Sequence, residues 1–254
     1  MQLPPIGLGT MGIENPDTIA TALECGYGHL DTAQIYGNEA VVGEGLARSS
    51  VPREDVVVAT KVWADSLAPE DVRETTAESL ERLGLEGVDL LYVHRPIEAY
   101  EPERTLPAFD DLSQEGTIGA VGLSNFSVSE LETARETLEA PIAAHQVEYH
   151  PLYQPEELLA DARENGYPLV AYSPLANGRA GEIDAVVDVA KRHETSPEAV
   201  CLAWLDAKEG VVPIPKASSR NHLEANLAAL ELELEDDELA RIDAVERTEE
   251  LFPE

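Results

Sequence analysis

The chain has 254 residues, of which 50 are acidic and 17 basic, and its formal net charge is -33. Nucleic acid and anionic membranes would be repelled by such a surface, so we expect neither as a partner. No stretch approaches the ~18 apolar residues of a membrane span, and the N-terminus lacks the basic flank and apolar run of a secretory signal, which together predict a cytoplasmic protein.

The acidic excess is far above what solubility requires, and the chain has only four lysines. This balance predicts adaptation to concentrated salt, where counterions screen the repulsion between like charges. An ordinary acidic cytosolic enzyme is the alternative.

Cys25 and Cys201 lie far apart on the apolar faces of expected helices, with no metal-binding spacing, and we interpret both as packing residues in a reducing compartment.

Apolar runs of strand length alternate with amphipathic helical runs along the whole chain. The expected strands are 5–10, 29–33, 56–62, 89–95, 120–125, 143–149, 169–175 and 211–216. The expected helices are 14–27, 68–84, 128–138, 154–166, 196–210 and 219–230, and two further helices are expected at 182–195 and 235–248. Eight strand-helix units in this length predict a single-domain (β/α)8 TIM barrel over residues 1–254, with the two further helices as additions.

The first expected loop reads GLGTMG at residues 7–12, which fits the glycine pattern of a Rossmann dinucleotide-binding turn, and Asp31 follows nineteen residues after Gly12. A Rossmann fold needs two half-sheets around a switch point and usually a second, differently patterned domain. The uniform alternation disfavours that fold. We therefore interpret GLGTMG as a barrel loop, and Asp31 as a residue of the barrel mouth.

Four polar residues follow or end the early strands: Asp31, Tyr36, Lys61 and His94. Each has an ordinary explanation when taken alone, as a turn cap, rim packing, a solvated strand end or a satisfied core histidine. Together they should converge at the carboxyl ends of the strands, where barrel active sites form. Lys61 and Asp31 would have to pair, and the ammonium would lower the pKa of Tyr36 and make it a better proton donor.

Eight segments in order along nearly the whole chain resemble the aldo-keto reductases. They read GLGT, HLDTAQIYGNEAVVGEGL, VVATKVW, DLLYVHRP, GAVGLSNF, HQVEYHP, AYSPLANG and PIPKASSRNHLEAN. The resemblance implies reduction of a carbonyl by hydride from a nicotinamide dinucleotide, with Tyr36 as proton donor. It implies that Lys61 and Asp31 tune this tyrosine, that His94 positions the carbonyl, and that Trp63 lines the substrate pocket.

The same resemblance implies a cofactor site without a Rossmann turn. Its residues would be Gly9, Thr10 and Asp31 near the nicotinamide, Ser124, Asn125 and Gln146 at the carboxamide, Tyr172 stacked on the ring, Ser173 and Leu175 at the pyrophosphate, and Lys216, Arg220 and Asn226 at the adenosine end. A lysine beside a helix N-terminus suits a phosphate. A solvated strand-end lysine is the alternative for Lys216.

Several positions depart from the family pattern. Where the family usually has serine, arginine and glutamate around the adenosine phosphate, this chain has Ala217, His222 and Ala225. Lys216 favours NADPH, and NADH or dual use is the alternative.

The usual N-terminal hairpin is absent or reduced. Three short segments, at 96–105, 176–184 and 249–254, predict an open pocket for small aldehydes or ketones, similar to that of the prokaryotic diketogluconate or methylglyoxal reductases. The resemblance also implies a monomer.

Two other classes of protein compete with this interpretation. A non-catalytic barrel could bind the dinucleotide as a sensor or regulatory subunit, but such a protein has no need of a tuned phenol. A metal-dependent barrel hydrolase could use His94, His145 and His150. The first strand lacks an H-x-H pair, however, and a separation of five residues puts His145 and His150 on opposite faces of an extended strand. We therefore predict no metal site.

Overall fold

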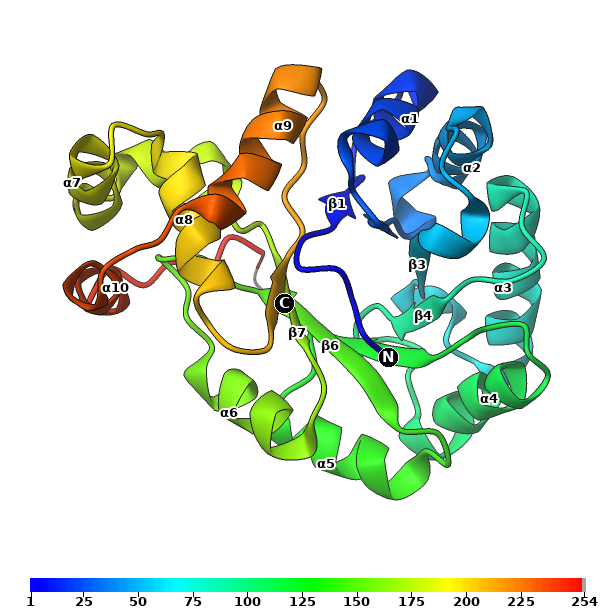
Figure 1. The fold of residues 1–254 in the computed structure, drawn as a ribbon. Helices are drawn as coiled ribbons and strands as arrows, with labels where there is room; N and C mark the ends of the chain where they lie inside the picture. The colour runs from blue at the N-terminus through cyan, green and yellow to red at the C-terminus, as the bar shows by residue number, and fades with distance from the viewer. Residues whose placement is uncertain (253–254) are drawn as a thin grey trace.

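The computed structural model describes residues 1–252, and its eight strands form one parallel sheet in the order β1 to β8 (Figure 1). The strands are β1 Leu8–Gly9, β2 His29–Asp31, β3 Val57–Val62, β4 Leu90–Val93, β5 Val121–Ser124, β6 Ile142–Glu148, β7 Leu169–Tyr172 and β8 Val211–Pro213. The backbone N–H of Gly7 donates to the carbonyl of Pro213 over 3.0 Å, and that of Gly9 to Pro215 over 3.2 Å. These bonds join the two ends of the sheet, and the (β/α)8 barrel prediction is confirmed.

Ten α-helices lie around the strands of the described chain (Figure 1). They are α1 Pro16–Cys25, α2 Glu39–Arg48, α3 Pro69–Leu83, α4 Pro102–Gln114, α5 Val128–Thr137, α6 Glu156–Asn165, α7 Asp184–Arg192, α8 Pro197–Asp206, α9 Arg220–Ala228 and α10 Asp236–Asp243. Eight of these helices were expected from the sequence, and α2 and α4 were not. Segment 96–105, expected to be a loop, includes the first turn of α4.

Local sequence explains where several helices begin and end. The Asn15 side chain accepts a hydrogen bond from the backbone of Asp17 before α1, and the Ser196 hydroxyl accepts one from Ala199 at the start of α8. Gly26 and Gly84 follow α1 and α3 in the left-handed conformation, which costs glycine little. These caps satisfy backbone groups that have no partner inside the helix.

The strands are buried on both faces, as in a barrel sheet covered by helices. A small inner cluster fills the barrel and a larger outer cluster packs the sheet against the helices. The inner cluster comprises Leu3, Ala59, Leu90, Tyr92, Ala143, Ala144, Val170, Val212 and Ile214. Residues 1–7 form no hairpin, and Leu3 packs into the inner cluster.

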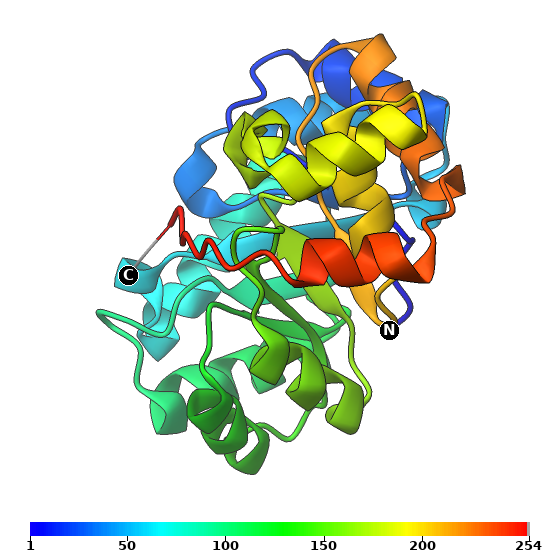
Figure 2. The ribbon, with the colours of Figure 1, turned by 90° about the vertical axis from the view of Figure 1, so that its left-hand side faces the viewer.

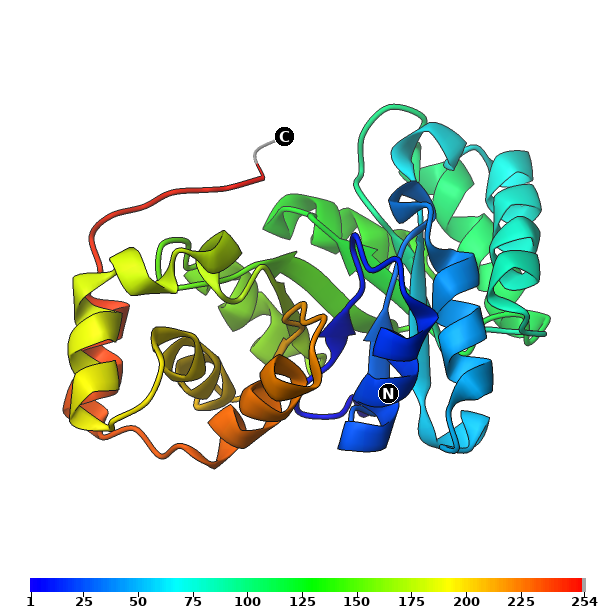
Figure 3. The ribbon, with the colours of Figure 1, turned by 90° about the horizontal axis from the view of Figure 1, so that it is seen from above.

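The two additional helices lie side by side on the outside of the barrel (Figure 1, Figure 2). Arg241 of α10 pairs with Asp188 of α7 at 2.5 Å, and Glu238 of α10 accepts a bond from His193 at 2.7 Å. Beyond α10 the chain crosses the end of the barrel opposite the N-terminus (Figure 3). None of the helices within residues 1–252 combines the length and the apolar character needed to span a membrane.

Candidate active site

A cavity of about 580 Å³ opens at the carboxyl ends of the strands. Thirteen of the residues singled out in the sequence line it: Gly9, Thr10, Asp31, Tyr36, Trp63, His94, Ser124, Asn125, Gln146, Tyr172, Ser173, Leu175 and Lys216. They come from every part of the chain, and the barrel topology brings them to one mouth. Lys61 lies just beneath this surface, whereas Arg220 and Asn226 do not line the cavity.

A buried ion pair forms the floor of the cavity. Lys61, at the end of β3, has no solvent exposure, and its Nζ donates to Asp31 Oδ1 over 2.5 Å and to the Thr32 carbonyl over 2.7 Å. The other carboxylate oxygen of Asp31 accepts a bond of 2.7 Å from Gln146 Nε2. A lysine ammonium and an aspartate are tolerated in a barrel interior only when paired and hydrogen-bonded in this way.

Tyr36 and His94 lie directly above this pair. The Lys61 Nζ is 5.1 Å from the centre of the Tyr36 ring, and the ring centres of Tyr36 and His94 are 6.0 Å apart at nearly a right angle. The Trp63 ring packs edge-on against His94, with centres 4.9 Å apart. A phenol, an imidazole and an indole thus share one corner of the cavity with a buried ammonium.

The protonation of this corner differs in one respect from expectation. Burial raises the pKa of Tyr36, and the nearby Lys61 charge lowers it only in part. The prediction of a lowered pKa for Tyr36 is therefore wrong for the cavity as it stands, because loss of solvent outweighs the attraction of the ammonium. Burial, followed by the charges of Lys61 and Arg95, lowers the pKa of His94 to about 2. The site holds a protonated phenol beside a neutral imidazole.

Asn125 connects the histidine to the aromatic wall of the cavity. Its Nδ2 donates to the His94 carbonyl over 2.9 Å, and its Oδ1 accepts a bond of 2.9 Å from the Tyr172 hydroxyl. Asn125, Ser173, Ala176 and Asn177 all have φ values between 49° and 61°. Non-glycine residues are seldom held in this region, and such backbone strain gathers at functional sites.

At the other end of the cavity the prominent charge is Lys216, which follows β8. Its side chain forms no ion pair with any carboxylate of residues 1–252, although the chain carries 50 acidic residues. A Cβ placed on Gly12 would lie 3.2 Å from Lys216 Nζ, so the GLGTMG loop and this lysine adjoin. A cation without an acidic partner in a cavity wall suits an anionic ligand group.

Arg220 and Asn226 belong to α9, which follows that lysine. Arg220 is exposed and pairs with Glu24 of α1 at 3.5 Å and with Glu224 of its own helix at 3.4 Å, so its charge already has two acidic partners. Asn226 is buried on the inner side of α9. Neither side chain reaches the cavity surface that Lys216 lines.

Sequence reasoning missed several lining residues, chiefly Arg95, Ile35 and Phe252. Arg95 directly follows His94 at a strand end, and this position could have identified it. Phe252 belongs to the tail that was expected to leave the pocket open, and it instead forms part of the wall. No local pattern marks Phe252, because it reaches the cavity only by the path of the chain after α10.

Two of the histidines weighed as metal ligands, His145 and His150, have other partners. His145 accepts a hydrogen bond from the Phe126 backbone, and His150 bonds to Glu148 at 2.7 Å. Within residues 1–252 no group of three histidine, cysteine, aspartate or glutamate side chains is arranged to hold a metal ion. Cys201 is buried in α8 and Cys25 is half-buried at the end of α1.

Comparison with known proteins gives a consistent assignment. The aldo/keto reductase family matches residues 5–247. Methylglyoxal reductase DkgB of Escherichia coli is 34% identical over 99% of this chain and 96% of its own, and glyoxal reductase of Bacillus subtilis is 34% identical over 100% and 92%. A crystal structure of a putative 2,5-diketo-D-gluconic acid reductase B superposes with a TM-score of 0.92 at 33% identity, covering 97% of this chain and 88% of that one. An aldo-keto reductase from a Medee basin deep-sea metagenome library gives 0.93 at 32% identity, covering 100% and 95%.

Proposed function

Since the chain belongs to the aldo/keto reductase family, we propose that it reduces small aldehydes and ketones to alcohols, with NADPH as hydride donor and Tyr36 as proton donor. Enzymes of this family are oxidoreductases that act on carbonyl groups with a nicotinamide dinucleotide. The finer assignment of residues and cofactor rests on the cavity described above.

The side chains of the cavity would divide the work as follows. A nicotinamide dinucleotide bound there would supply the hydride. The Tyr36 hydroxyl gives its proton to the carbonyl oxygen, and the ammonium of Lys61, held by Asp31, stabilises the phenolate that remains. The neutral imidazole of His94 orients the carbonyl oxygen by a hydrogen bond. Trp63 packs beside the substrate.

One observation carries this proposal: the Lys61–Asp31 pair lies fully buried directly beneath Tyr36. Burying two charges is costly, and a barrel that only bound a dinucleotide would gain nothing from it. Beneath a phenol, the pair prepares the site for the negative charge that develops when the proton leaves. The sensor alternative offers no reason for this arrangement.

The cofactor site would extend from this corner to Lys216. Ser124, Asn125 and Gln146 would hold the carboxamide, and Tyr172 would stack on the nicotinamide ring, with Gly9, Thr10, Ser173 and Leu175 along the groove. Lys216 favours NADPH because its charge has no acidic partner within residues 1–252. Arg220 is paired with Glu24 and Glu224, and it would have to break these ion pairs to help bind the adenosine phosphate. For this reason NADH, which lacks that phosphate, stays the alternative cofactor.

The remaining features of the proposal concern the whole protein. We propose a cytoplasmic monomer, a single domain over residues 1–254, that works in concentrated salt and has no nucleic acid or membrane partner. The net charge of -33 supports the salt and partner assignments. The relatives named for methylglyoxal and glyoxal support a small reactive aldehyde as substrate.

The test is a fluorescence titration of the purified protein in high salt with NADPH and NADH separately, followed by absorbance decay of the reduced nicotinamide when a small aldehyde is added. We expect tighter binding of NADPH, and decay on adding aldehyde. Binding without decay would favour the non-catalytic alternative. If neither dinucleotide bound, the functional assignment would be overturned.

The role of Lys216 has its own test. Lys216→Met should raise the Kd of NADPH by about 10-fold, since a charge-assisted contact to phosphate contributes roughly 1.5 kcal/mol, and should change the Kd of NADH much less. Lys191→Met is the matched control, because Lys191 is exposed on α7 and does not line the cavity. Equal effects of Lys216→Met on both dinucleotides would contradict an adenosine-phosphate role.

A further inference from the structure

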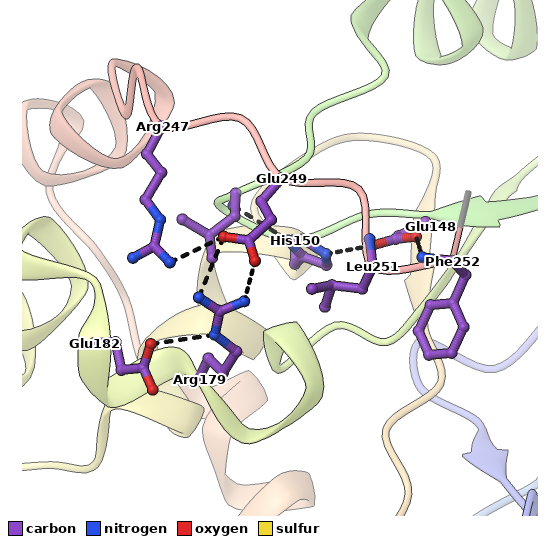
Figure 4. A network of polar contacts seen from close by, with 9 residues as sticks. Glu148, His150, Arg179, Glu182, Arg247, Glu249, Leu251 and Phe252 are labelled. Atoms are coloured by element: carbon purple, nitrogen blue, oxygen red, sulfur yellow. Dashed lines mark hydrogen bonds and ion pairs between the residues drawn. The ribbon is translucent and has the colours of Figure 1, made fainter.

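The last described residues form an anchored tail. After α10 the chain runs back across the barrel mouth, and we refer to residues 247–252 as the C-terminal tail (Figure 3). The Glu249 N–H donates to the Leu152 carbonyl over 2.7 Å. The next bonds are unusual, because the N–H groups of Leu251 and Phe252 donate to the two oxygens of one carboxylate, that of Glu148, over 2.8 Å and 3.1 Å (Figure 4).

Glu148 is built to receive these two N–H groups. It ends β6, its side chain is buried, and His150 Nε2 lies 2.7 Å from its Oε1. The Leu152 N–H donates to His150 Nδ1, so this nitrogen carries no proton and Nε2 is the one that donates to the carboxylate. A buried carboxylate with both oxygens occupied has one fixed orientation, and the tail is held in register with β6.

A second anchor ties the same tail to the loop after β7. Arg179 forms a two-pronged ion pair with Glu249, and Arg247 bonds the same carboxylate at 2.9 Å (Figure 4). Arg179 also contacts Glu182 at 3.1 Å, within its own loop. This loop continues directly from Ser173–Gly178, which lines the cavity. The tail is therefore fixed from two sides of the mouth.

The anchors place one side chain in the cavity. Phe252 lines it, with its ring 5.8 Å from that of Tyr172 at 78°, and its carbonyl accepts a bond of 3.1 Å from Arg95. Glu148 and Tyr172 are register partners on β6 and β7. The distance between the Phe252 wall and the proposed nicotinamide-stacking residue is thus set by adjacent strands of the barrel.

We propose that Glu148 is a positioning residue for substrate selection: it holds the C-terminal tail so that Phe252 forms an apolar wall for the substituent of the carbonyl compound. The Arg179–Glu249 pair is the second support of the same wall. The enzyme would then favour aldehydes that carry an apolar substituent over those that carry none. This inference rests on the proposed function, because it concerns the substrate of the same cavity.

The test compares two aldehydes that differ by one phenyl group, propanal and 3-phenylpropanal, in four variants. In Phe252→Ala and Glu148→Gln we expect KM for 3-phenylpropanal to rise by about 10-fold, as expected when an aromatic contact is lost. The KM for propanal, both kcat values and the Kd of NADPH should change less than about twofold. Glu249→Gln should raise the KM for 3-phenylpropanal by a smaller factor. Glu182→Gln is the control and should leave this KM unchanged, because it removes the other carboxylate bonded to Arg179 while the tail keeps its own bonds.

Hydrogen exchange at the amides of Leu251 and Phe252 gives a second readout without cofactor or turnover. Exchange should be faster in Glu148→Gln and Glu249→Gln than in the unmodified protein and Glu182→Gln.

Unchanged exchange would overturn the proposal that Glu148 anchors the tail. Faster exchange with an unchanged ratio of the KM values for 3-phenylpropanal and propanal would overturn its role in substrate selection. If the unmodified enzyme reduced neither aldehyde, the proposed function would fail, while exchange would still test the anchor. Glu249→Gln keeps the test open if Glu148→Gln does not fold, because Glu249 lies at the surface.

Discussion

At the scale of single residues, the cavity combines a phenol that stays protonated with a cation that prefers the phenolate. Burial raises the pKa of Tyr36 while Lys61 lowers it, and the effect of burial is the larger of the two. Tyr36 therefore carries its proton at neutral pH. As that proton is transferred to a substrate, the Lys61 ammonium beneath the ring stabilises the charge that forms.

This argument predicts the effect of Tyr36→Phe. Removing the hydroxyl should lower kcat by about 10²- to 10⁴-fold, the usual contribution of a positioned proton donor, and leave the Kd of NADPH nearly unchanged. Single-turnover and titration measurements would separate the two quantities. Tyr100→Phe is the control, because Tyr100 packs on Phe126 outside the cavity. Retained turnover in Tyr36→Phe would contradict the proton-donor role.

Buried histidines make a separate prediction about acid stability. Burial lowers the pKa of His29 to about 4 and that of His145 to about 3. Each is neutral in the folded chain and gains a proton on unfolding below pH 6.5. The stability that these histidines give is therefore present above pH 6.5 and is lost as the pH falls toward their folded pKa values.

We expect each of these histidines to reduce the free energy of unfolding by about 1.4 kcal/mol between neutral pH and pH 5.5. Denaturant unfolding at pH 7.5 and 5.5 would measure the loss. His145→Gln, which keeps an acceptor near the Phe126 N–H, should weaken the pH dependence by that amount. His222→Gln, at an exposed position of α9, should leave it unchanged. The same slope in all three proteins would show that His145 is protonated when folded.

The positions of the mouth residues could be predicted from the sequence, but their electrostatic state could not. Asp31, Lys61 and His94 end apolar runs, and parallel strands of a barrel bring such ends together. The pKa of Tyr36 depends on how much solvent the cavity excludes, and that is set by residues as distant as Phe252. A pattern of neighbours along the chain does not contain this information.

At the scale of elements, close packing around α2 depends on two glycines. A Cβ on Gly43 would lie 2.1 Å from the Leu83 carbonyl oxygen, and one on Gly45 would lie 2.6 Å from that of Pro16. The helix thus approaches the backbone at the end of α3 and the start of α1 more closely than any side chain allows. This approach keeps Asn38 in place before α2, where its amide bonds the Thr10 carbonyl at the cavity.

Gly43→Ala should therefore destabilise the protein, although alanine ordinarily favours helices. The backbone of Leu83 cannot move aside cheaply, so we expect a loss of about 1–3 kcal/mol in the free energy of unfolding, typical of overpacking. Urea unfolding would measure it. Gly181→Ala is the matched control, because a Cβ there meets no atom within 4 Å. Stabilisation by Gly43→Ala would show that α2 can shift outward.

Elements with strong periodicity and clear caps were predictable, and those without were not. The helix α3 begins at Pro69 and ends before Gly84, so its bounds followed from the sequence. The helix α4 has Pro102 and Pro107 in its first half, a composition that does not predict a helix, and its first turn falls in segment 96–105, which was expected to be a loop. The C-terminal tail has no regular structure, and long-range bonds to Leu152, Glu148, Arg179 and Arg95 fix it.

At the scale of the whole molecule, the dominant property is the excess of negative charge. Arginines form pairs such as Arg73 with Asp111 and Glu115, but 17 basic residues cannot balance 50 acidic ones. Most carboxylates must face solvent, where their repulsion extends over a Debye length of about 10 Å at 0.1 M salt and about 3 Å at 1 M. The compact barrel concentrates this repulsion, which the unfolded chain relieves.

Removing salt should consequently destabilise the fold. On dialysis from about 2 M to 0.1 M KCl we expect Tm to fall by at least about 10 °C, which corresponds to roughly 3 kcal/mol for a chain of this length. Sorbitol at matched osmolarity should not restore Tm, because it does not screen charge. Replacing both Glu132 and Glu136, an exposed like-charged pair one turn apart on α5, by glutamine should raise Tm at low salt and leave it unchanged at high salt. A Tm independent of KCl in both proteins would mean that the acidic surface is not an adaptation to salt, because screening would then contribute nothing to the stability of the barrel.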